Sequence, residues 1–278
     1  MAVQPRRLVG TLALLGCGLT LGGAAQAADY TGLVHARHQL TLSVAVPGVV
    51  ARVAVQPGMR VAAQAPLLLL DDRIQAAEEQ RRKVVLDDLS ETRATEERLK
   101  IVQPLAEDAR KLVGTKGAIS REDAARTELD WVATRGRLAQ LEVQKKRERI
   151  EHQAAELERQ QRRLLAPVAG VVTKVAIDVG EWARPGDALV ELVDASELHL
   201  RVNVPAAAAR SLKEGATLQV GFEAALGLAP VQGQVSFISP AVDASSGLTA
   251  LRVRFANPGG RIPPGIKGLI SIAAGAAK

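Results

Sequence analysis

The residue types that most often carry chemistry are few and scattered in this chain. The four histidines, His35, His38, His152 and His199, are assigned to different predicted elements, and no carboxylate or thiol cluster stands at metal-ligand spacing. The single cysteine, Cys17, falls in an N-terminal apolar stretch. The sequence therefore predicts no catalytic residues, no cofactor and no metal site, and we expect a protein that is not an enzyme.

The charge balance is basic, with a formal net charge of +6 and a pI near 9.8. A basic chain can indicate nucleic-acid binding. Here lysine and arginine alternate with aspartate and glutamate along one stretch, and aromatic residues make up only 2% of the chain. This pattern favours a solvated, mixed-charge helix surface and argues against a nucleic-acid partner.

The N-terminus has the pattern of an export signal. Two arginines precede an apolar stretch, Leu8 to Leu21, and the small-x-small site Ala25-Gln26-Ala27 follows it. We expect residues 1–28 to be a cleaved signal peptide and the mature chain to act in the periplasm. Two alternatives remain open: Leu14 to Cys17 could be a lipidation box, or the apolar stretch could stay as an anchor.

An internal repeat is the strongest pattern in the sequence. The segment that begins Gly48-Val49-Val50 returns 122 positions later as Gly170-Val171-Val172, and Gly58 returns at the same offset as Gly180. Each copy reads as short strands separated by glycine turns, and a unit of about 25 residues is too small to close a core. We therefore expect the two copies to be halves of one small β-sandwich.

The repeat resembles the two half-motifs of the biotinyl/lipoyl carrier fold. In true carriers the halves follow each other directly, and a lysine on the connecting hairpin takes the cofactor. Here a long insertion separates them and that lysine is missing. The departure argues against a carrier enzyme.

The insertion predicts two long helices, Asp72 to Val113 and Ser120 to Leu165, because it is rich in good helix formers. Residues 114–118 supply helix breakers, and Ser120 is a suitable N-cap with an acidic residue three positions later. We expect a bend or a loosened turn near Pro104. Arms of about 40 residues would extend roughly 60 Å, which favours a projecting antiparallel hairpin over a generic dimerising or spacer coiled coil.

Heptad spacing predicts how the arms pack on each other. In the second arm the expected seam is Val143, Arg147, Ile150, Ala154, Leu157, Gln161 and Leu164. In the first arm it is Val85, Leu89, Thr92 and Leu99, followed by Val102 or Leu105, Ala109 and Leu112.

The last third of the chain changes to strand patterns and predicts a small antiparallel β-barrel. Residues 30–38 are expected to add a strand to it. Five strands and one short helix are expected at Leu198 to Val204, Ala206 to Leu212 (the helix), Thr217 to Phe222, Val231 to Ile238, Thr249 to Phe255 and Leu269 to Ile272.

The predicted fold class is α+β, elongated and multidomain. An antiparallel coiled-coil hairpin is inserted in a split lipoyl-like β-sandwich, and a small antiparallel β-barrel follows. The expected boundaries are 1–28 for the signal peptide, 29–40 for a strand joining the barrel, 41–72 and 166–194 for the lipoyl-like halves, 73–165 for the hairpin and 195–278 for the barrel.

This order of parts resembles the periplasmic adaptor, or membrane fusion, family of tripartite efflux systems. The most specific segments are Val46 to Val50, Ala166 to Val172, Ile238 to Asp243 and Phe255 to Pro258, and the last two look most like adaptors of resistance-nodulation-division pumps. The resemblance implies a non-catalytic adaptor at the inner membrane that links a transporter there to an outer-membrane channel protein. It also implies self-association into a ring, hexameric in the assembled machine. The chain departs from the family pattern in length, since a fourth, membrane-proximal domain would need more sequence after the barrel, and we therefore expect three domains.

The resemblance also implies that the hairpin tip docks on the exit duct through an Arg, Leu and Ser set. Leu112 and Ser120 carry over, whereas the arginine does not, because Arg110 is too close to Leu112. The docking candidates are therefore Leu112, Ser120, Arg110 and Lys116. Helix packing and N-capping are the plainer roles for Leu112 and Ser120.

Two alternative functions remain open. The protein could be a free-standing periplasmic coiled-coil tether, or it could be an adaptor of an ATP-driven exporter.

Overall fold

The computed structural model describes residues 27–113 and 119–273. The predicted signal segment up to residue 26, including Cys17, and the tip residue Lys116 lie outside these ranges. The contacts divide the chain into two compact units, which we describe separately. Of the described residues, unit 1 contains 27–35, 198–256 and 262–273, and unit 2 contains 36–113, 119–197 and 257–261. No helix in the described ranges is long and apolar enough to cross a membrane.

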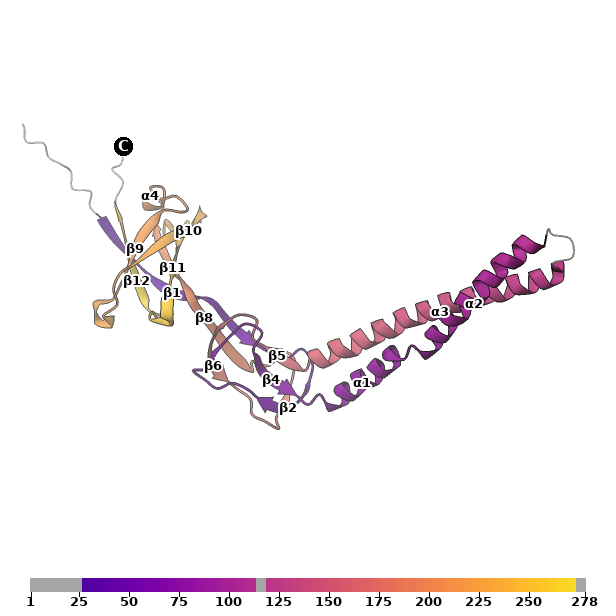
Figure 1. The fold of residues 1–278 in the computed structure, drawn as a ribbon. Helices are drawn as coiled ribbons and strands as arrows, with labels where there is room; N and C mark the ends of the chain where they lie inside the picture. The colour runs from indigo at the N-terminus through magenta and orange to yellow at the C-terminus, as the bar shows by residue number, and fades with distance from the viewer. Residues whose placement is uncertain (1–26, 114–118, 274–278) are drawn as a thin grey trace, which may run out of the picture. The chain divides into compact units, whose positions relative to one another are not determined.

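Unit 2 contains the two copies of the repeat, and their short strands pair with each other (Figure 1). The edge strand of each copy pairs with the other copy: β2 with β7, and β3 with β6. The strands are β2 (Gly48–Val53), β3 (Arg60–Val61), β4 (Pro66–Leu70), β5 (Arg163–Leu165), β6 (Gly170–Val175), β7 (Trp182–Ala183) and β8 (Val190–Pro205).

The pairing of the two copies is reciprocal, as in an approximate two-fold. Gly48 is opposite Ala183, and Gly170 is opposite Val61, each partner being the 122-residue equivalent of the other. The hydrogen bonds repeat in the same way: the Val50 amide donates to the Glu181 carbonyl over 2.9 Å, and Val172 donates to Met59 over 2.9 Å. The expectation that the twin segments fold against each other is confirmed.

Burial in the core of unit 2 follows the same offset. Its fourteen buried residues form seven equivalent pairs, so each copy supplies half of one continuous hydrophobic cluster. The pairs are Val44 with Ala166, Val50 with Val172, Val55 with Ile177, Val61 with Ala183, Leu67 with Leu189, Leu68 with Val190, and Leu70 with Leu192.

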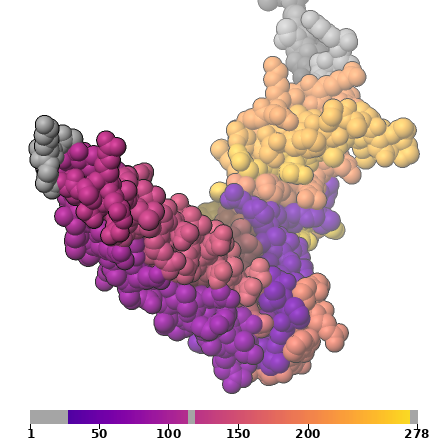
Figure 2. Space-filling view, turned by 90° about the vertical axis from the view of Figure 1, so that its right-hand side faces the viewer, coloured from indigo at the N-terminus to yellow at the C-terminus, as the bar shows by residue number. Residues whose placement is uncertain are grey.

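The hairpin consists of α1 (Arg73–Asp87), α2 (Ser90–Leu112) and α3 (Arg121–Gln160). In Figure 2 the purple α1 and α2 lie along the magenta-to-pink α3. The second arm was predicted to continue to Leu165, but α3 ends at Gln160 and residues 163–165 form β5, which pairs with β4. Strand pairing with β4 is therefore favoured over a further helical turn.

The first arm is interrupted at a place that the sequence did not indicate. Pro104, where a bend or a loosened turn was predicted, lies inside α2, and the break between α1 and α2 falls earlier, at Asp88 and Leu89. The Asp88 carboxylate accepts a 3.0 Å hydrogen bond from the Ser90 amide, a local turn that competes with the helix. From α3, Lys145 Nζ donates to the Val85 carbonyl over 3.0 Å, which satisfies an acceptor at the end of α1.

The predicted seam of the second arm was wrong. Val143, Ile150 and Leu157 are 48%, 65% and 59% exposed. The buried residues of α3 are Thr134, Leu141 and Ala155, which lie on the opposite face. Small side chains let the helices approach closely, and this face also carries the polar partners of the first arm.

The seam of the first arm was predicted only in part. Val102 and Ala109 are buried, together with Ala106, whereas Val85, Leu89, Leu105 and Leu112 are exposed.

Ion pairs between the two arms set their register along the hairpin. Arg98 reaches Asp130 over 2.5 Å, and Arg159 binds Asp72 over 2.9 Å and Glu79 over 3.1 Å. Two further pairs join Arg82 to Glu151 and Arg137 to Glu91. Because most of these side chains are exposed, we expect them to contribute to register more than to stability.

We predict that Gly136→Ala will stabilise the hairpin. Gly136 lies in the middle of α3, and a Cβ added there would meet no heavy atom within 4 Å. Removing the backbone freedom of a mid-helix glycine should raise the free energy of unfolding by about 0.5–1 kcal/mol. Urea denaturation followed by circular dichroism would measure the change, and an unchanged or lower midpoint would contradict the prediction.

The strands of unit 1 form a closed sheet, in which the last strand pairs with the first. The order is β1-β12-β9-β10-β11-β8, and β8 also pairs with β1. The predicted helix at 206–212 is shorter, and β10 and β12 are longer than predicted. The elements are β1 (Ala27–Leu42), α4 (Ala206–Ala209), β9 (Thr217–Phe222), β10 (Val231–Val242), β11 (Leu248–Ala256) and β12 (Lys267–Ala273).

The closing contact of this barrel is a close approach of two backbones. A Cβ on Gly32 of β1 would lie 2.1 Å from the Arg201 carbonyl oxygen of β8. Only glycine allows this distance. Inward residues alternate along β8, where Leu198, Leu200 and Val202 are at most 3% exposed, and such alternation is typical of a strand with one buried face.

Candidate functional site

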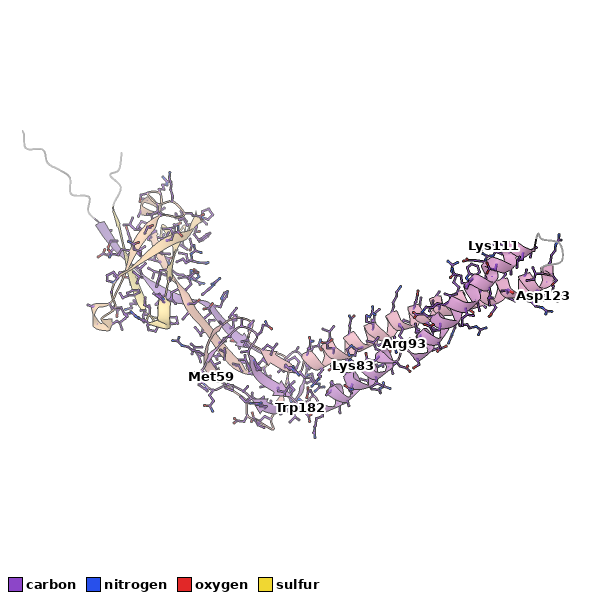
Figure 3. The ribbon with its side chains drawn as sticks, viewed as in Figure 1. Met59, Lys83, Arg93, Lys111, Asp123 and Trp182 are labelled. Carbon is purple, nitrogen blue, oxygen red and sulfur yellow. The ribbon has the colours of Figure 1, made fainter. Side chains whose placement is uncertain are left out.

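The candidate site is the tip of the hairpin, where α2 ends and α3 begins. Figure 3 shows Lys111 and Asp123 near this end, one on each helix. Of the four residues predicted to dock, Leu112, Ser120 and Arg110 lie in the described ranges, and Lys116 does not. Their surroundings differ, so each is considered in turn.

Leu112 is the last residue of α2 and remains accessible. Its exposed fraction is 43%, and that of the following Val113 is 37%. The heptad interpretation placed Leu112 between the arms, but the structure turns it toward solvent. Two adjacent half-exposed apolar side chains at the end of a helix are available for contact with another surface.

Ser120 is the N-cap of α3. Its backbone is extended, with φ −73° and ψ 151°, and its hydroxyl oxygen accepts a 3.0 Å hydrogen bond from the Asp123 amide. The same hydroxyl donates to the Asp123 carboxylate over 2.6 Å. The capping interaction expected from the sequence is therefore present, with aspartate in place of the usual glutamate.

We predict that Ser120→Ala will fray the start of α3. The substitution leaves the Asp123 amide without its acceptor, which typically costs about 1 kcal/mol. Hydrogen exchange should become faster at the amides of the first turn, whereas exchange in the middle of α3 should not change. Ser120→Asn serves as the control, since asparagine is an equally good N-cap whose side chain can both accept from the Asp123 amide and donate to the Asp123 carboxylate, and it should preserve the protection.

Arg110 joins the two arms near the tip. Its guanidinium donates two hydrogen bonds to Glu128, over 2.6 and 2.7 Å, and lies 4.7 Å above the ring of Trp131. The hydrogen bonds from Arg110 lower the pKa of the Glu128 carboxyl. Arg110 therefore positions α2 against α3, rather than projecting from the tip.

Sequence reasoning missed Glu128 and Trp131. Their three-residue spacing places them on one face of α3. This spacing is the only sequence signal for them, and it becomes informative once the register between the two arms is known.

Comparison with known proteins gives one family match and several similar folds. Residues 197–276 match the family described as CusB-like, beta-barrel domain. MacA from Actinobacillus actinomycetemcomitans is 17% identical with a TM-score of 0.68, over 89% of this chain and 78% of that one. The chain has the membrane fusion protein fold.

Two further structures share this fold. A membrane fusion protein from Streptococcus pneumoniae R6 is 12% identical with a TM-score of 0.55, over 88% of this chain and 98% of that one. A MacA-MexA chimera with the Pseudomonas aeruginosa MexA alpha-hairpin domain is 14% identical with a TM-score of 0.53, over 90% and 79%. No curated protein sequence matches significantly. The fold class is thus confirmed, and the fold is the one that the order of parts indicated.

The histidines of this membrane fusion protein fold do not form a site. His35 and His38 were assigned to different elements, but both lie on β1. His38 Nδ1 is 3.3 Å from Asp194 Oδ2. Burial alone would raise the pKa of the Asp194 carboxyl, but hydrogen bonds from Ser196 and His38 bring it below its usual value. Within residues 27–113 and 119–273 no group of three or more metal-binding side chains comes together.

Proposed function

We propose that this protein is a periplasmic adaptor that links an inner-membrane efflux transporter to an outer-membrane exit duct and has no catalytic activity of its own. In this function the protein connects two partner proteins and acts through the surfaces that contact them. We propose export by the signal at residues 1–28, association with the inner membrane and assembly into a hexameric ring.

The observation that carries the proposal is that the hairpin is inserted in the sequence between the two halves of one hydrophobic core. Within unit 2 the chain leaves the strands after β4, runs out along α1 and α2, and returns along α3 to β5, which pairs with β4. Both ends of the arm are therefore fixed at the same place, and the 40 residues of α3 correspond to about 60 Å of helix. A long arm anchored at one end suits a protein that reaches a partner across a gap.

Unit 1 supplies the second argument. The match of residues 197–276 to a CusB-like barrel domain supports a pump of the resistance-nodulation-division type as the inner-membrane partner. An ATP-driven exporter is the alternative partner. Purification from membranes under mild conditions should recover the transporter with the adaptor, and its sequence would distinguish the two classes.

The tip geometry refines the docking proposal. Leu112, with Val113 beside it, is the residue that we propose contacts the duct, because its side chain is accessible. Ser120 and Arg110 are positioning residues, since the hydrogen bonds of the first cap α3 and those of the second join the arms. Lys116 is proposed as a further contact from its place in the sequence between them.

The docking proposal is tested by replacing exposed apolar side chains of α2 with arginine, at the tip and away from it. Leu112→Arg should abolish export, because a charge would replace the apolar contact at the tip. Ile101→Arg is the control, since Ile101 is 63% exposed on the same helix but away from the tip, and it should leave export unchanged. Unchanged export in both Leu112→Arg and Ser120→Arg, at equal expression, would reject docking through the tip.

A photo-crosslinker at position 112 in living cells distinguishes the adaptor from a free-standing tether. An adaptor should crosslink to an outer-membrane channel protein, whereas a tether should crosslink to other envelope proteins.

Intact mass provides a separate check on the absence of enzymatic function. A mass equal to that of the bare processed chain would exclude a covalent biotin or lipoate.

A further inference from the structure

An apolar stripe runs along the outer face of α3. Leu129, Val132, Val143, Ile150 and Leu157 follow heptad spacing and are 69%, 51%, 48%, 65% and 59% exposed. The positions between them in the same pattern, 136 and 139, hold the small residues glycine and alanine. Lys146 and Gln153 are the polar interruptions, and the aliphatic stem of Lys146 can lie along apolar neighbours. Such a stripe is typical of a coiled-coil seam, and its exposure indicates a partner helix.

The stripe is separate from the contacts that hold the hairpin together. The buried residues of α3, Thr134, Leu141 and Ala155, each lie five positions after a heptad position of the stripe. Five residues correspond to a rotation of about 140° around an α-helix. The two faces are therefore nearly opposite, and α1 and α2 pack only on the face that carries the buried residues.

The charges along one edge of the stripe are self-complementary. Arg135, Glu142, Arg149 and Glu156 alternate in sign at steps of seven. None of these four has an ion-pair partner within the described ranges, whereas other exposed charges of α3 do, for example Arg137 with Glu91. Arg135 also lies 5.6 Å from the ring of Trp131. Charges of alternating sign beside an apolar seam favour a partner helix whose own charges alternate in the opposite order, because each charge then faces one of opposite sign.

We propose that the stripe of α3 binds the same stripe of a second copy, with the two helices antiparallel about a two-fold axis near residues 144 and 145. In this arrangement Val132 faces Leu157 of the second copy, and Ala139 faces Ile150. In the same register Glu142 lies near Arg149 and Arg135 near Glu156, each partner being two residues beyond the level position and within reach of a long side chain, and symmetry makes each contact twice. A parallel pairing in register would instead place these four charges opposite positions 140, 147, 154 and 161, of which only Arg147 is charged, so three of the four would stay unmatched.

The pairing goes beyond the adaptor function, because it turns two hairpin tips in opposite directions. Two copies joined in this way cannot present their tips to one exit duct. The pair is therefore a resting form that must separate before an adaptor ring forms. Because the stripe lies on α3 between residues 129 and 157, substitutions in it leave Leu112 and Ser120 unaltered, and the two proposals can fail independently.

Charge reversal tests the pairing in the full chain with Cys17→Ser. Analytical ultracentrifugation should find a dimer of the parent protein, and Glu142→Arg should weaken it about tenfold, because two attractive contacts become repulsive. Adding Arg149→Glu to Glu142→Arg should restore the parent affinity. Glu158→Arg, an exposed position of α3 outside the stripe, is the matched control and should leave the affinity unchanged.

Disulfide trapping tests the orientation. In the same background a Val132→Cys protein is mixed with a Leu157→Cys protein under mild oxidation, and the mixed disulfide should predominate over either homodimer. Circular dichroism should show unchanged helix content, because both side chains lie away from the buried face. Any of three results would overturn the proposal: a monomer at every concentration, a dimer insensitive to Glu142→Arg, or a predominant Val132→Cys homodimer.

Discussion

Gly32→Ala is expected to unfold the barrel of unit 1. The added methyl group would lie 2.1 Å from the Arg201 carbonyl oxygen and 2.8 Å from Val202 Cβ. Both are parts of a neighbouring strand rather than flexible side-chain ends, so β1 and β8 must separate to admit it. Overpacking of this kind costs about 3 kcal/mol or more, since it also removes the pairing that closes the barrel.

A second glycine of the same barrel provides the control for Gly32→Ala. Gly221 lies in β9, and a Cβ there would meet only Leu269, at 3.9 and 4.0 Å, which is ordinary contact. Gly221→Ala should therefore change the free energy of unfolding by less than about 1 kcal/mol. Hydrogen exchange of the barrel strands is the measurement. If the amides of the barrel strands are protected from exchange equally well in Gly32→Ala and in Gly221→Ala, the closing contact between β1 and β8 is contradicted.

Leu70→Ala and Leu192→Ala should each lower the free energy of unfolding of unit 2 by about 2–5 kcal/mol. The two leucines are equivalent positions of the repeat, and both are 0% exposed in the shared cluster. Truncation leaves a cavity in a core to which both copies contribute. Because the core is shared, both substitutions should shift the same unfolding transition, although they are 122 positions apart.

Tryptophan fluorescence can follow this transition, because both tryptophans, Trp131 and Trp182, belong to unit 2. Urea denaturation of the two variants should show one transition with a lower midpoint in each case. Ile74→Ala is the control, since Ile74 is 80% exposed on α1, and its effect should stay within about 0.5 kcal/mol. Two transitions that respond separately to the two leucine substitutions would show that the copies form separate cores.

Much of the fold could be predicted because it follows from local composition and from repetition. The repeat of Gly48 to Val55 at Gly170 to Ile177 predicts one two-part core, since neither half can bury its apolar residues alone. Helix-forming residues interrupted by a single proline, Pro104, predict the two arms of the hairpin, and strand alternation predicts the barrel. The N-cap at Ser120 was also predictable, because its hydrogen bond involves only its own helix.

The candidate site was less predictable, because its contacts join distant parts of the chain. Arg110 was considered as a tip residue, but its hydrogen bonds to Glu128 depend on the register between α2 and α3. The break at Asp88 depends partly on Lys145, which comes from the other arm. Neither contact has a signature within one helix.

By itself, the sequence determined the elements, their order and the division into two halves of a core, an inserted hairpin and a barrel, since these follow from periodicity and repetition. Only the tertiary structure decided which stripe of α3 turns inward. The stripe with the larger apolar side chains, Val143, Ile150 and Leu157, lies outside, and the one with Thr134, Leu141 and Ala155 lies inside. The physical reason is that a helix buries the face that fits its neighbour, here through small side chains and cross-arm ion pairs, and hydrophobicity alone does not specify that fit.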